Sequence, residues 1–179
     1  MAETVEERRG LYWFIYFGIA MALIFLNFLP QQMLPTRLAP PDILLALTLA
    51  WTIRRPEFVP LALVAVLFLM ADLLYHRPPG VFAAATIIGL EFLRSRAQDM
   101  RRAAFAIEWI VVGVTIIGVF ALTRIITGLA LVAQPPLGLS LVQMALTIAI
   151  YPVVVVISHY VFGVRSTLQG SVEDIGSRL

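Results

Sequence analysis

Apolar residues form six runs along this chain, and charged residues are confined almost wholly to the segments between those runs. A helix rising 1.5 Å per residue needs about 20 apolar residues to cross a hydrocarbon core about 30 Å thick. Four runs approach or exceed that length, and two are shorter. The pattern predicts an all-α, polytopic membrane helix bundle of about six transmembrane helices. The expected spans are 11–29, 42–53, 58–75, 81–93, 103–126 and 139–161.

These spans predict one bundle over residues 1–165, followed by a polar cytoplasmic tail at 166–179. A charged loop is expected at 94–102, and Pro152 predicts a kink in the last helix. The short run 81–93 either spans the bilayer or enters and leaves on the same side. The acidic amino terminus favours an uncleaved first helix over a signal peptide, which would carry a positive start.

Composition supports a membrane location. Hydrophobic residues make up 60% of the 179 residues and charged residues 13%, whereas soluble domains average roughly a quarter charged. The net charge of +2 comes from arginine, because the chain has no lysine. These arginines flank apolar runs, so topology explains them and no nucleic-acid partner is expected. The absence of cysteine removes disulfides and thiolate metal sites.

The arginines are distributed unequally between the two sides of the predicted zigzag. Ten arginines lie on the side of the termini and three on the other side. Arginine favours the cytoplasmic side of a membrane protein, so both termini are expected in the cytoplasm. The three arginines on the outer side are Arg37, Arg77 and Arg124.

A Pro-Pro pair stands before the second, fourth and sixth predicted helices, at 40–41, 78–79 and 135–136. Proline suits the first turn of a helix, where its missing N–H would have no partner. The chain therefore reads as three helical hairpins of the same orientation, although prolines also gather in membrane loops without any such repeat.

Two aspartates are the most informative polar residues. Asp42 follows Pro-Pro at a helix start, and capping of the free N–H groups is its favoured role. Asp72 lies near the outer end of the third predicted helix, where it either faces the bundle beside an arginine or is solvated at the interface. Arg124 is the preferred partner of Asp72, and Arg77 is the alternative.

On the inner side, Glu91 and Arg94 are spaced for an ion pair on one helix face. Glu91 and Glu108 could join the loop arginines and clamp the fourth and fifth helices together. A solvated fringe of weak ion pairs is the favoured reading.

Small residues four apart allow helices to approach closely in a membrane. The pairs Gly80/Ala84, Ala85/Gly89 and Ala46/Ala50 show this spacing, and Gly18/Ala22 shows it more weakly. Packing within the bundle is the first expectation for these pairs. Docking of a partner helix is the second.

Catalytic and metal-binding motifs are missing from the sequence. It contains no H-E-x-x-H, no G-x-S-x-G and no phosphate-binding glycine loop. Its two histidines are isolated, at positions 76 and 159. No catalytic residue, metal site or cofactor is therefore expected.

Several short motifs, in order and spacing over about residues 10 to 165, resemble the MreD family of bacterial rod-shape-determining membrane proteins. The resembling motifs are Pro41-Asp42-Ile43-Leu44-Leu45, Trp51, Arg54-Arg55-Pro56, Pro60, Ala71-Asp72-Leu73-Leu74, Pro79-Gly80 and Glu91-Phe92-Leu93-Arg94. The Pro-Asp and Asp-Leu-Leu elements are the specific parts.

This resemblance implies a fold similar to the membrane-embedded substrate-binding subunits of vitamin transporters. It implies a non-enzymatic scaffold of peptidoglycan synthesis during cell elongation, in the inner membrane. The implied partners are MreC, RodA with its penicillin-binding transpeptidase, and indirectly MreB. Asp42, Asp72, Pro79 and Gly80 carry over as structural motif positions.

A small-molecule-binding transporter subunit is the alternative function, suggested by fold analogy alone. Such a subunit should gather polar groups at mid-membrane depth. This chain has few there, chiefly Asn27, Gln143 and scattered threonines. Their scarcity favours the scaffold.

Overall fold

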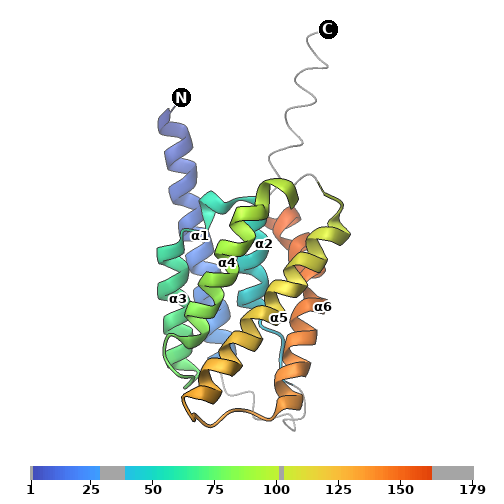
Figure 1. Ribbon diagram of the computed structural model, residues 1–179. Helices are drawn as coiled ribbons and strands as arrows, with labels where there is room; N and C mark the ends of the chain where they lie inside the picture. The colour runs from blue at the N-terminus through green and yellow to red at the C-terminus, as the bar shows by residue number, and fades with distance from the viewer. Residues whose placement is uncertain (1, 29–38, 101–102, 163–179) are drawn as a thin grey trace.

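The computed structural model describes residues 2–28, 39–100 and 103–162, and within these ranges it describes side chains from Gly10 to Val161. In these ranges the chain is all-helical (Figure 1). The elements are α1 (Ala2–Phe28), α2 (Ile43–Arg54), the 3-10 helix η1 (Pro56–Phe58), α3 (Leu61–Leu74), α4 (Val81–Met100), α5 (Phe105–Leu129) and α6 (Leu137–Phe162). The predicted tail at 166–179 and Arg37 lie outside the described residues.

The six α-helices in this part of the chain run alternately up and down (Figure 1). The start of α1 and the end of α6 therefore lie at one end of the bundle, which also holds η1 and which we call the η1 end. The α3–α4 turn and the α5–α6 connection lie at the opposite end, which we call the turn end. α2, α4 and α6, each preceded by a Pro-Pro pair, share one direction, as the predicted hairpins require.

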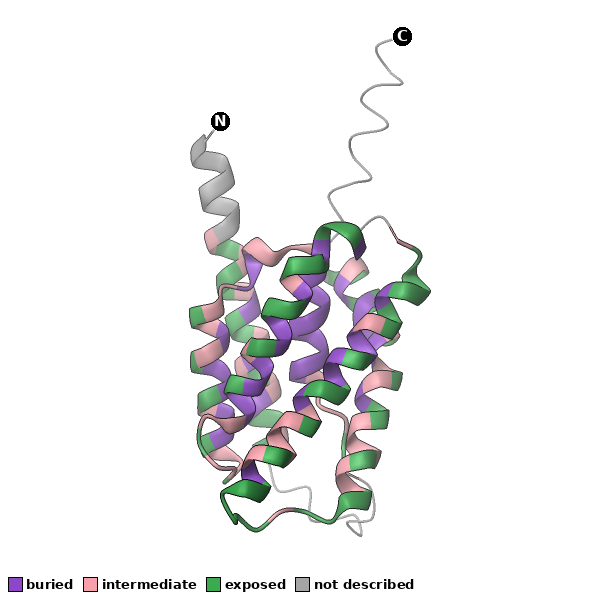
Figure 2. Ribbon diagram, viewed as in Figure 1, coloured by how far each residue is buried: buried purple, intermediate pink, exposed green. Residues whose placement is uncertain are grey.

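α2 forms the centre of the bundle, and all residues from 44 to 53 are buried (Figure 2). A helix that is apolar all round is typical of such a position. Its two internal threonines satisfy their hydroxyl groups locally: Thr48 donates to the Leu44 carbonyl and Thr52 to the Thr48 carbonyl, each at 2.7 Å. α2 thus presents no unsatisfied hydroxyl donor to its neighbours.

α1 packs against the bundle through one stripe, formed by Tyr16, Ala20 and Ile24. The Tyr16 hydroxyl lies 2.8 Å from Thr48 Oγ1 of α2. From Gly10 onward, the face of α1 opposite this stripe is apolar and uncovered, and Phe14 on it is 78% exposed. α1 is therefore the peripheral helix.

Each predicted span coincides with a helix, but two bounds differ markedly. α1 begins at Ala2 instead of residue 11, and α4 continues to Met100. The loop predicted at 94–102 is wrong for 94–100. Leu93, Ala97 and Met100 continue the buried stripe of α4, and this packing keeps the charged segment helical.

The turn-end termini of α3 and α5 are closed in the same way. Arg77 N–H donates to the Asp72 carbonyl at 2.9 Å, and Val132 N–H donates to the Thr127 carbonyl at 3.1 Å. His76 and Leu131 supply the left-handed residue, with φ of 55° and 53°. These are Schellman motifs, which satisfy the last helical carbonyls.

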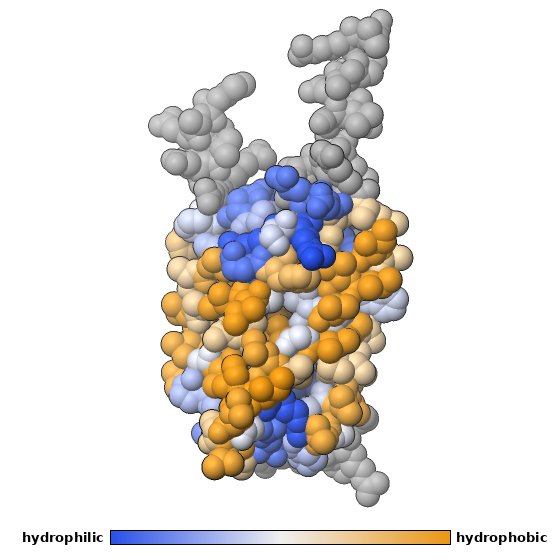
Figure 3. Space-filling model, viewed as in Figure 1, coloured by the Kyte–Doolittle hydropathy of each residue, from blue (hydrophilic) through white to orange (hydrophobic). Residues whose placement is uncertain are grey.

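Three helical segments are long and apolar enough to cross a membrane: Gly10–Phe28, Phe105–Leu129 and Leu137–Val161. α2 and α3 are apolar but have 12 and 14 residues, or about 18 and 21 Å. Hydrophobic residues cover much of the side surface, while hydrophilic residues gather at the η1 end and in a smaller patch near the turn end (Figure 3). These features agree with an α-helical membrane protein.

Candidate functional site

The carboxylate of Asp72 holds the start of α4. Asp72 is fully buried in the last turn of α3, and its Oδ2 accepts N–H groups from Gly80 at 3.1 Å and Ala83 at 3.2 Å. These donors are at the start of α4, where backbone N–H groups lack helical acceptors. The α4 dipole also favours a negative charge there. One side chain thus caps a helix that begins nine residues later.

Arg124 is not the partner of Asp72, which corrects the preferred pairing. Its Nη1 donates to the Pro135 carbonyl at 3.2 Å and to Ser140 Oγ at 3.1 Å, so it links α5 to α6. Arg77, the alternative, does attract Asp72 electrostatically. The direct hydrogen bonds to Asp72 nevertheless come from backbone, because the α3–α4 turn folds back over the carboxylate.

The turn itself explains the Pro79-Gly80 motif. Gly80 has φ of 83°, a left-handed conformation that glycine adopts without steric cost. Pro79 precedes this bend and is exposed. The bend directs the Gly80 N–H toward Asp72, so Asp72, Pro79 and Gly80 act as one structural unit.

Asp42 caps α2, as the sequence predicts. Its Oδ1 accepts the Leu45 N–H at 3.0 Å, and its own N–H donates to Thr147 Oγ1 of α6 at 2.9 Å. Its other oxygen lies 3.9 Å from Arg77 Nη1. The two motif aspartates therefore have the same function at different helix starts, and Arg77 stands between them.

A second polar cluster lies toward the η1 end of the bundle. Arg54 Nη1 pairs with Glu108 Oε1 at 2.8 Å, and the Tyr151 hydroxyl donates to the same oxygen at 2.6 Å. The Arg54 and Glu108 side chains are only 13% and 10% exposed. This cluster ties α2 to α5 and α6. Two predictions for Glu108 are therefore wrong: it is not solvated, and it does not link the fourth helix to the fifth.

Glu91 does stay at the fringe. It is 55% exposed and lies 3.8 Å from Arg94 Nη1. Arg94 reaches instead toward the backbone, where its Nη2 donates to the Val59 carbonyl. A further buried polar contact that the sequence did not predict joins α2 to α6: Trp51 Nε1 donates to Ser158 Oγ at 3.1 Å. The polar residue types were visible in the sequence, but their partners are 35 to 107 positions away.

Most of the predicted docking residues are inside the bundle. Ala46, Ala50 and Ala85 have at most 1% exposure, and Gly89 is buried. A Cβ on Gly89 would lie 2.9 Å from Val119 Cγ2, so glycine permits the close contact of α4 with α5. These four residues offer no surface to a partner, so the prediction that a partner helix docks on them is wrong. Among the set, Ala84 is exposed and Gly80 is half-buried.

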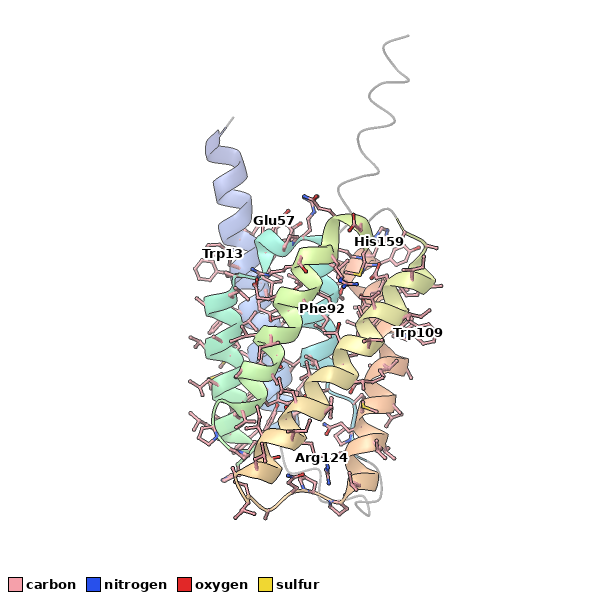
Figure 4. The ribbon with its side chains drawn as sticks, viewed as in Figure 1. Trp13, Glu57, Phe92, Trp109, Arg124 and His159 are labelled. Atoms are coloured by element: carbon pink, nitrogen blue, oxygen red, sulfur yellow. The ribbon has the colours of Figure 1, made fainter. Side chains whose placement is uncertain are left out.

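A cavity of about 390 Å³ opens between the start of α4, the second half of α5 and the first half of α6. Its walls include Phe82, Phe120 and Met144, with Gln143 and Arg124 among its polar groups. Figure 4 shows Arg124 between α5 and α6 at the turn end. No group of three or more acidic or histidine residues suited to a metal occurs in the described part of the chain.

Comparison with family models, curated proteins and solved structures found no match.

Proposed function

We propose that the chain is a non-enzymatic inner-membrane scaffold of the MreD type. It would maintain rod shape by docking MreC and the wall synthases, RodA and its penicillin-binding transpeptidase, with MreB linked indirectly. One observation carries this proposal: the buried carboxylates hold the chain's own helices together. Asp42 and Asp72 cap helix starts, and Glu108 pairs with Arg54. The remaining apolar side surface is suited to association within the membrane.

The proposed topology has six membrane-embedded helices, with both termini in the cytoplasm. The alternating directions of the helices support it (Figure 1). The burial of the short helix α2 also supports this topology, because a short helix surrounded by longer neighbours does not have to match the bilayer thickness. Arginines indicate the cytoplasmic side: Arg54, Arg55, Arg94 and Arg96 belong to the η1 end.

The proposed docking surface for the single MreC helix is the outer face of α1. Gly18 and Ala22 are exposed and four residues apart, and Phe14 and Phe25 beside them are 78% and 62% exposed. Small residues between large ones allow a second helix to approach closely. Because α1 contacts its own bundle through one stripe, this face is open to a partner.

Co-purification from native membranes tests the scaffold directly. Mild solubilisation of a tagged chain should recover MreC and RodA together, and depletion of the chain should turn elongated cells round. Normal rods after depletion, with no MreC recovered, would refute the scaffold.

The alternative, a small-molecule-binding transporter subunit, is favoured by one observation, the 390 Å³ cavity. Its volume is in the range of ligand sites. Tight binding of a vitamin-sized solute by the purified chain, together with normal cell shape after depletion, would support this alternative.

A further inference from the structure

The cavity at the turn end joins an apolar wall to two positive charges. Arg77 and Arg124 both line it, whereas aspartate and glutamate are missing from its lining. Val81, Phe82, Phe120 and Met144 supply apolar surface. A ligand that fits both parts has an anionic group and a hydrocarbon chain.

Arg124 carries the uncompensated charge. In the described residues its hydrogen-bond acceptors are the Pro135 carbonyl and the Ser140 hydroxyl, which are both neutral. No described carboxylate lies within ion-pair distance of it, whereas Arg77 is attracted by Asp42 and Asp72. Ionisable groups near a hydrocarbon region are normally paired, so an anion at Arg124 would complete the site.

The depth of the arginines fits a lipid headgroup. Arg124 is five residues before the end of α5, or about 7 Å along the helix axis, and Arg77 lies in the α3–α4 turn. α5 has 25 residues, about 37 Å, which exceeds a hydrocarbon core of about 30 Å. The turn end therefore reaches headgroup depth, and Phe120, four residues before Arg124, lies about 6 Å deeper along α5.

We propose that this cavity binds one anionic phospholipid, with the phosphate beside Arg124 and an acyl chain along Phe82, Phe120 and Met144. The acyl chain would gain little free energy by leaving other lipid acyl chains for the cavity wall, because both surroundings are equally apolar. Selectivity therefore rests on the headgroup, through charge-assisted hydrogen bonds from the guanidinium. The site is separate from the outer face of α1, so it does not depend on the scaffold proposal.

The test uses the full chain in detergent, titrated with phosphatidylglycerol, phosphatidylcholine or inorganic phosphate while its melting temperature is recorded. Phosphatidylglycerol should stabilise the chain more than the other two. Arg124→Gln should weaken phosphatidylglycerol binding about tenfold or more, since a charged hydrogen bond is lost. Arg96→Gln is the matched control, because Arg96 is an exposed arginine in the second half of α4, away from the cavity.

A second variant keeps the charge and fills the space. Ala121→Phe places a ring at an exposed residue of the cavity lining and should weaken phosphatidylglycerol binding although Arg124 is intact. Equal stabilisation by phosphatidylglycerol and phosphatidylcholine, or equal affinity in Arg124→Gln and Arg96→Gln, would overturn the proposal. Stabilisation by inorganic phosphate as strong as that by phosphatidylglycerol would also overturn it, because the site would then serve a soluble anion.

Discussion

The Oδ2 atom of Asp72 accepts the backbone N–H of Gly80 at 3.1 Å, which binds the end of α3 to the start of α4. The same oxygen accepts the Ala83 N–H. The buried carboxylate of Asp72 therefore has a structural role, which is to cap the start of α4.

Replacing Asp72 should separate the α3–α4 turn from its cap. Asp72→Ala leaves two N–H groups without their acceptor and should lower the free energy of unfolding by about 2–3 kcal/mol. Asp72→Asn keeps one carbonyl oxygen as an acceptor, so it should lower the free energy of unfolding less than Asp72→Ala does. Thermal unfolding in detergent measures both, with the exposed Asp99→Ala as control. An unchanged melting temperature in Asp72→Ala would show that the cap is dispensable.

The Arg54–Glu108 and Arg94–Glu91 ion pairs, both toward the η1 end, should differ in strength. Glu108→Gln leaves the Arg54 charge, only 13% exposed, without its counterion and should cost about 3 kcal/mol. Glu91→Gln removes a 55% exposed partner and should cost less than about 1 kcal/mol. Equal losses of thermal stability in these two variants would contradict the prediction that the more buried ion pair contributes more to stability.

Gly89 should tolerate no side chain. Gly89→Ala places a Cβ 2.9 Å from Val119 and 3.0 Å from Thr115, which should push α4 from α5 and cost about 1–3 kcal/mol. Gly118→Ala on the exposed side of α5 meets nothing within 4 Å and should not destabilise the protein. Melting temperatures of the two variants distinguish a packing role from general sensitivity to glycine loss.

Docking on α1 can be tested without damage to the bundle. A Cβ on Gly18 meets nothing within 4 Å, so Gly18→Leu should fold normally yet reduce MreC recovery several-fold, because it blocks close helix approach. Gly118→Leu, equally open but on α5, is the control. Loss of MreC from Gly118→Leu alone would move the docking surface to α5.

Topology is accessible to cysteine labelling, because the chain has no native cysteine. A cysteine at Gln134, at the turn end, should react with an impermeant reagent in intact cells. A cysteine at Gln98, near the η1 end, should react only after permeabilisation. The reverse pattern would invert the proposed orientation.

The predicted capping role of Asp42 is confirmed, because it depends on residues three positions apart. Helix positions are likewise close to prediction, since long apolar runs broken by proline and arginine define them locally. The end of α4 differs from the prediction, because the tertiary packing of Ala97 and Met100 keeps its charged last turns helical.

The sequence by itself determined the helices, their order and the residues available for polar contacts. Only the tertiary structure decided which surfaces face inward, and so which small residues pack and which are exposed. The physical reason is that lipid and a protein interior are equally apolar, so a helix that is apolar all round has no periodicity to reveal its buried face. The same uncertainty in helix rotation hid the pairing of Glu108 with Arg54, 54 residues away.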